Sequence, residues 1–194
     1  MSPDREYSRR RFPTGAVAGV SVGITGCSGG SGGTPTASFD TPFERDVDPA
    51  RTYLRTQSDD AGDARPVDLA SIGLRPGTTV VLERRGLCTG SSGGTGMTGL
   101  FSADGTLESA DVRERVVGAI DAGDDYQTSP TDEGGVETDI PEVFLVADNE
   151  DDQTSVTVTV PDGATHLFVA AIDNFYQDNA RGETRFELRI ETPE

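Results

Sequence analysis

The sequence is poor in the residue types on which many functions depend. Its 194 residues include no Lys, one His and two Cys, and all 16 basic residues are Arg, against 34 Asp and Glu. Few basic residues disfavour nucleic acid as a partner, because phosphate contacts need clustered Lys and Arg. One His and no nucleophile motif make an enzyme the least supported class, and we expect a protein without catalytic activity.

Long apolar runs and paired cysteines are also lacking. The apolar stretch 15–24 is too short to span a bilayer, so a transmembrane helix is not expected there. If Cys27 is modified, as argued below, Cys88 is left as the only thiol of the domain, and no intramolecular disulfide forms. No base lies near Cys88 in the sequence, which favours a small, half-buried side chain over a reactive one.

What is abundant is negative charge. The formal net charge is −18, and such a charge destabilises a compact state in dilute buffer. At about 1 M salt the repulsion is screened to within about 3 Å, so the composition is typical of a salt-adapted microbe. Disorder is the alternative interpretation of high acidity, but the Val, Ile and Phe patterns of the C-terminal half restrict it to a tether.

The first residues are typical of an export signal. Residues 8–12 contain Arg9 and Arg10 and resemble a twin-arginine motif, and residues 24–27 resemble a lipobox that ends at Cys27. We expect residues 1–26 to be a signal peptide and Cys27 to carry a lipid that holds the protein on the outer face of the cell membrane. The alternative is an accidental pair of Arg residues near the start.

The rest of the chain predicts a tether followed by an all-β domain. We expect residues 27–66 to form a Gly, Ser and Asp-rich tether and linker, with one short helix near 49–57, and residues 67–194 to form a β-sandwich. Strand-like runs recur between Gly, Pro and Asp at 67–72, 78–85, 142–147, 154–160, 166–172 and 183–191.

Three of these runs carry more detailed predictions. The last alternates strictly between apolar and charged residues, as a half-buried strand does. The run 166–172 is apolar on both faces, as expected of a central strand. Pro161, Asp162 and Gly163 predict a turn, from which we expect a hairpin between 154–160 and 166–172. Segments 86–99 and 121–139 are expected to be long loops.

Oxygen-bearing side chains follow the predicted central strand. Asp173, Asp178 and Asn179 surround a short turn, and backbone carbonyls of the turn, such as that of Tyr176, add further oxygens. Ca²⁺ takes six to eight oxygen ligands at about 2.3 to 2.6 Å, so these residues predict a calcium site. The alternative is an ordinary polar turn in an acidic protein. A second acidic run, 148–152, is more simply explained as a solvated surface.

These residues and the segments around them resemble a known family. Residues 161–169 with Asp173, Asp178 and Asn179, and residues 74–86 upstream, are similar to PA-IL-like calcium-dependent galactose-binding lectins, over about residues 67–191. The resemblance implies a jelly-roll-like sandwich and a Ca²⁺ ion held by Asp173, Asp178, Asn179 and backbone carbonyls, including one between Leu87 and Gly90.

The resemblance also implies a ligand, because sugar hydroxyls complete the calcium shell in that family. The ligand residues are then Asp173, Asp178 and Asn179, and we expect Tyr126 to offer its ring to a sugar. The sequence therefore predicts a calcium-dependent carbohydrate-binding module whose partner is a cell-surface glycan. A structural lipoprotein that uses calcium only for stability, with another surface protein as its partner, is the alternative.

Overall fold

A computed structural model of the chain describes residues 42–56, 59–89, 96–123, 132–133, 136–137, 140–148, 153–173, 175–181 and 185–193. All of them belong to the unit Gly33–Glu194. Five residues named in the predictions lie outside the described ranges, namely Arg9, Arg10, Cys27, Gly90 and Tyr126, as does the whole predicted signal peptide 1–26.

The first sheet is antiparallel and contains the clearest sequence pattern. Its strands, in spatial order, are β1 (Phe43–Asp46), β15 (Glu187–Glu191), β5 (Thr79–Arg85) and β12 (Ser155–Thr159). In β15, Leu188 and Ile190 are buried while the alternating Glu and Arg residues are only partly covered. The predicted half-buried strand is therefore confirmed within the described residues.

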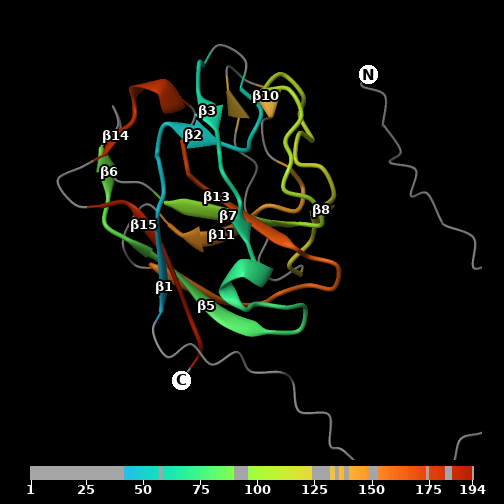
Figure 1. Ribbon diagram of the computed structural model, residues 1–194. Coiled ribbons are helices and arrows are strands. Elements are labelled where there is room, and N and C mark those ends of the chain that lie inside the picture. Colours follow the sequence, from blue (N-terminus) through green and yellow to red (C-terminus); the bar gives the residue numbers. More distant parts are fainter. Residues whose placement is uncertain are drawn as a thin grey trace, which may run out of the picture. The chain divides into compact units, whose positions relative to one another are not determined.

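The second sheet contains the central strand. Its order is β11 (Phe144–Ala147), β7 (Met97–Ser102), β13 (His166–Ala171) and β4 (Val67–Asp68), with β8 (Ala119–Ile120) also paired to β7. β13, β7 and β11 lie next to one another in Figure 1. The side chains of β13 are buried on both faces from Leu167 to Ala171, which confirms the prediction of a covered central strand.

The remaining described elements are short. Three two-stranded pairs and two 3-10 helices complete them: β2 (Arg51–Thr52) with β3 (Gly62–Asp63), β6 (Cys88–Thr89) with β14 (Ala180–Arg181), β9 (Asp132–Glu133) with β10 (Val136–Glu137), η1 (Ala70–Ile72) and η3 (Tyr176–Asp178). Among the strands that the structure describes, only β2 and β3 pair in parallel. No α-helix occurs in the described ranges, so the described fold is all-β.

Two hydrophobic clusters cover the two faces of the second sheet. The first cluster joins inward side chains of both sheets, including Leu82, Leu188, Phe144 and Leu167. The second lies on the opposite face of β7 and β13 and contains Tyr53, Leu54, Leu100, Val116, Ile140 and Phe168. The second sheet is therefore packed between the first sheet and the irregular segments.

The segment expected to be a linker takes part in this packing. β1 pairs with β15, and Val47, Tyr53 and Leu54 are buried. The short helix expected near 49–57 is wrong for residues 49–56, which contain β2 instead. The folded domain therefore begins no later than Phe43, because these apolar side chains cover core surface that would otherwise face water.

Three other predictions are corrected by the pairing. The strand 67–72 ends at Asp68, because Oδ1 of Asp68 accepts a hydrogen bond from the Ser71 N–H at 3.2 Å and η1 follows. The turn at Pro161 forms, but the hairpin is wrong: β12 pairs with β5 and β13 with β7, so the chain crosses between sheets. The loop 86–99 is interrupted by β6 and ends at Met97, where β7 begins.

Candidate functional site

The predicted site follows β13 directly. Asp173 lies two residues after the strand, and its Oδ1 accepts a hydrogen bond from the Phe175 N–H at 3.1 Å, which starts the turn. η3 then forms a single turn, in which Tyr176 is buried and Asp178 is exposed. The Tyr176 hydroxyl donates a hydrogen bond to the Ala171 carbonyl at 3.3 Å, which anchors η3 to the end of β13.

A carboxylate that the sequence analysis missed holds η3 in place. Asp59 accepts hydrogen bonds from two successive N–H groups, of Tyr176 and of Gln177, the second at 3.0 Å. Asp59 lies 117 residues before Tyr176, so no local pattern signals this contact. The turn is therefore tied both to its own strand and to the segment between β2 and β3.

Asn179 is the most informative residue of the turn. The residue is 9% exposed, and its Nδ2 donates to the Pro49 carbonyl at 3.1 Å. Its Oδ1 is also buried and accepts no hydrogen bond. Such an orphaned oxygen costs about 1–3 kcal/mol. An amide oxygen is also a common Ca²⁺ ligand, so a cation beside Asn179 would supply the missing partner.

The loop after Gly86 lies beside this turn. β6 pairs with β14, which places Thr89 opposite Ala180 and Cys88 opposite Arg181. The segment in which a carbonyl ligand was expected thus runs along the strand that directly follows Asn179, although Gly90 itself lies outside the described residues. Cys88 is 1% exposed, so it is more deeply buried than expected.

The described residues supply only part of a calcium shell. Among them, no group of three or more His, Cys, Asp or Glu side chains is placed to hold a metal ion. Asp178 and the Oδ1 of Asn179 are adjacent in the chain, while Asp173 already accepts the Phe175 N–H. Asn179 Oδ1 is the one buried side-chain oxygen of the described residues that lacks a hydrogen-bond partner, so it is the atom that best fits a cation. The carboxylates of Asp173 and Asp178, backbone carbonyls and water are the other candidate ligands.

A pocket of about 300 Å³ lies next to the turn that contains Pro49. It opens beside β1, and Val169 of β13 also lines it. Its charged lining residues are Arg45, Asp46, Asp48, Arg51 and Arg65. The sequence analysis missed this pocket, because seven of its eight lining residues lie in the segment that was expected to be a linker.

Comparisons with known proteins add no relative. The chain matches no family of known proteins, and neither the curated proteins nor the solved structures contain a match. Within the part of the chain that the structure describes, no helix is both long enough and apolar enough to cross a membrane.

Proposed function

We propose that this chain is an exported, lipid-anchored binding module that recognises carbohydrate through a calcium ion at the turn 173–179. The observation that carries the proposal is the buried Oδ1 of Asn179, which has no hydrogen-bond partner. We further propose that the two sheets belong to a jelly-roll-like sandwich, and that a lipid on Cys27 holds the domain at the outer face of the cell membrane.

Several contacts support a cation at this turn. The exposed Asp178 precedes Asn179 and would add a negative charge to the shell. The Pro49 carbonyl fixes the Asn179 amide by accepting from its Nδ2, so Oδ1 is preoriented. The bound ion would keep solvent-facing positions on the Asp178 side, where the hydroxyl groups of a sugar could replace water.

A second function is favoured by the position of Asn179 in the fold. The Asn179–Pro49 hydrogen bond joins residues 130 positions apart, and Asp59 caps η3 from the same early part of the chain. A cation held there would link the first and last segments of the domain. It would stabilise the folded state without any glycan, because it binds only that state.

Calcium titration of the full chain tests the metal. We would remove divalent ions, keep sodium constant and measure binding by calorimetry for the wild type, Asp178→Ala and Asp162→Ala. We expect one saturable site, weakened about tenfold or more by Asp178→Ala because the shell loses a charge. Asp162 is an exposed carboxylate in the turn before β13, so Asp162→Ala is the control and should leave affinity unchanged.

A glycan screen with and without calcium then separates the two functions. Binding of a glycan only in the presence of calcium supports the lectin-like module. Calcium binding that raises the melting temperature with no glycan bound supports the structural role instead. If the wild type binds no calcium, both versions of the site are wrong. Anchoring is tested separately, since Cys27→Ala should release the protein from the membrane fraction.

A further inference from the structure

The pocket beside β1 has an unusual charge balance for this chain. Acidic residues outnumber basic ones by 34 to 16, yet the pocket is lined by three Arg and two Asp. Oδ2 of Asp48 is 3.3 Å from Nε of Arg51, and Asp46 lies 4.0 Å from Arg185 outside the pocket. Within the described chain, Arg45 and Arg65 have no carboxylate partner.

The guanidinium of Arg45 is held in a fixed position. Its Nη1 donates to the Pro66 carbonyl at 2.7 Å, which joins the edge strand of the first sheet to the residue before β4. Burial lowers the pKa of Arg45, and the nearby positive charge of Arg65 lowers it further. Both effects disfavour the charged guanidinium of Arg45. An anion bound between Arg45 and Arg65 would therefore stabilise the charged forms of both side chains.

The remaining walls of the pocket are apolar. Val47, Ala64 and Val169 are only 5–6% exposed and line it. A volume of about 300 Å³ is at the small end of ligand sites in proteins. Arg guanidinium groups bind carboxylates through two parallel hydrogen bonds. Most of the exposed lining of the pocket is polar, so the pocket suits a small, largely polar molecule that carries one planar anionic group and touches these three apolar side chains.

We propose that this pocket binds a small organic carboxylate through Arg45 and Arg65. The site goes beyond the proposed function, because it needs no calcium and uses none of the residues of the turn 173–179. The net charge of −18 repels anions at long range. At 1 M salt this long-range repulsion is screened to within about 3 Å. The hydrogen bonds between the guanidinium groups and a bound carboxylate are direct contacts and are screened less. We therefore expect the site to function in concentrated salt.

Binding is tested on the full chain with two pairs of matched ligands. Glucuronate is compared with glucose and benzoate with benzamide, by calorimetry in Tris buffer at constant ionic strength, after divalent ions are removed on a chelating resin. The variants are Arg45→Gln and Arg65→Gln. Arg75→Gln is the matched control, since Arg75 is exposed and does not line the pocket. Thermal melting checks that each variant is folded.

We expect the wild type to bind at least one carboxylate and not to bind its neutral counterpart. The affinity for that carboxylate should fall at least tenfold in Arg45→Gln and in Arg65→Gln, and it should not change in Arg75→Gln. Binding of neither carboxylate overturns the proposal, as does an equal effect of Arg65→Gln and Arg75→Gln. Equal affinity for inorganic sulfate overturns the assignment to an organic ligand. Asp178→Ala should leave carboxylate binding intact, so failure of the calcium site is distinguishable from failure here.

Discussion

Arg115 is the largest side chain among the fully buried residues of the described chain, with 2% exposure. Its guanidinium donates to the carbonyls of Leu54 and Glu108, at 3.3 and 3.1 Å, and to Oδ1 of Asp63 at 2.6 Å. It thereby joins three segments that cover the outer face of the second sheet. A buried charge is tolerated because its donors are hydrogen-bonded.

Replacing Arg115 should destabilise the domain strongly. Arg115→Met keeps much of the side-chain volume but leaves the Leu54 and Glu108 carbonyls without this donor, so we expect the free energy of unfolding to fall by about 2–4 kcal/mol. Urea denaturation at constant salt measures the change. Asp63→Ala should cost less than Arg115→Met, because both carbonyl acceptors of the guanidinium remain and the Asp63 carboxylate is 66% exposed. Equal losses in the two variants would show that the ion pair dominates.

Residue-level chemistry explains why the sequence revealed only part of the candidate site. Asp173, Asp178 and Asn179 were found because they follow one strand within seven residues. Asp59 and Pro49, which contact the same turn, are far away in the sequence and were missed. Their roles arise only when the fold brings the early segment against η3, and neither contact leaves a periodic or local pattern.

At the scale of the elements, periodicity predicted strands well and partners less well. β5, β11, β12, β13 and β15 fall within runs identified from the sequence. The prediction of a hairpin was wrong because a Pro-Asp-Gly turn specifies a reversal of the chain but not the sheet that the next strand joins. β7 was not predicted because its glycine makes the segment resemble a loop. The fold needs that glycine, since a Cβ on Gly99 would lie 2.6 Å from the Phe144 ring.

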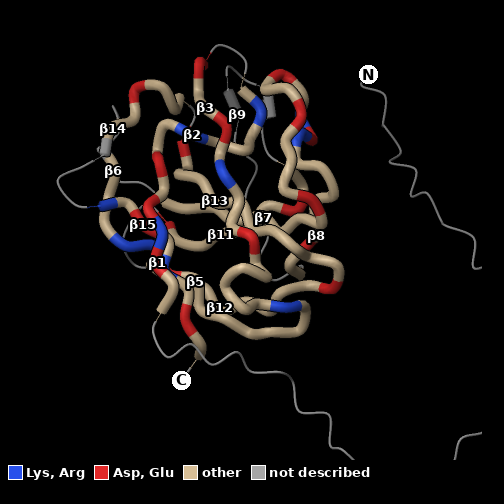
Figure 2. Tube along the Cα trace, in the orientation of Figure 1, with Lys and Arg blue, Asp and Glu red and all other residues tan. Residues whose placement is uncertain are grey.

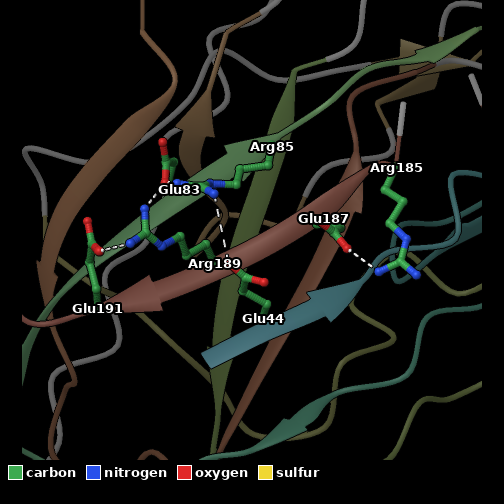
Figure 3. Close-up of polar contacts among 7 residues, drawn as sticks. All are labelled: Glu44, Glu83, Arg85, Arg185, Glu187, Arg189 and Glu191. Carbon is green, nitrogen blue, oxygen red and sulfur yellow. Dashed lines mark hydrogen bonds and ion pairs between the residues drawn. The ribbon is translucent and has the colours of Figure 1, made fainter. Parts of the chain in front are cut away.

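The outward face of the first sheet carries a network of charges (Figure 3). Arg189 on β15 is its centre, with Nη1 3.2 Å from Glu83 on β5 and Nη2 2.7 Å from Glu191. Arg85 is also 3.1 Å from Glu83. One cation thus lies between two carboxylates of adjacent strands, where cross-strand pairs of opposite charge stabilise a sheet.

Removing that cation should weaken the sheet in a manner that depends on salt. We expect Arg189→Gln to lower the free energy of unfolding by about 0.5–1 kcal/mol at 0.1 M NaCl, because Glu83 and Glu191 then repel each other. The loss should nearly vanish at about 1 M, where screening shortens to about 3 Å. Arg185→Gln is the control, since Arg185 is 77% exposed and should matter little. A loss that is the same at both salt concentrations would indicate packing rather than charge.

For the whole molecule, the arrangement of charge matters more than any one pair. Asp and Glu positions recur on strands and loops throughout the described part of the chain (Figure 2). The network on the first sheet neutralises some of these charges locally, but the whole sequence has 34 acidic residues and only 16 basic ones. The excess repels itself in the folded state, and salt is the factor that relieves it.

This view predicts that removing a few exposed charges stabilises the chain only in dilute salt. Asp104, Asp121 and Asp162 are exposed, and Asp104 and Asp121 accept backbone N–H bonds from Thr106 and Gly123. Asn keeps the accepting oxygen and removes the charge. We therefore expect the triple Asp→Asn variant to melt roughly 2–4 °C higher than the wild type at 0.2 M NaCl, a gain of about 1 kcal/mol.

At 3 M NaCl the same variant and the wild type should melt together, because the repulsion that the substitution relieves is already screened. Differential scanning calorimetry of both proteins at the two salt concentrations provides the comparison. An equal gain at both would mean that Asn improves the turns themselves, and an equal loss would mean that the turns need carboxylates. Only a gain confined to dilute salt assigns the effect to the net charge of the folded chain.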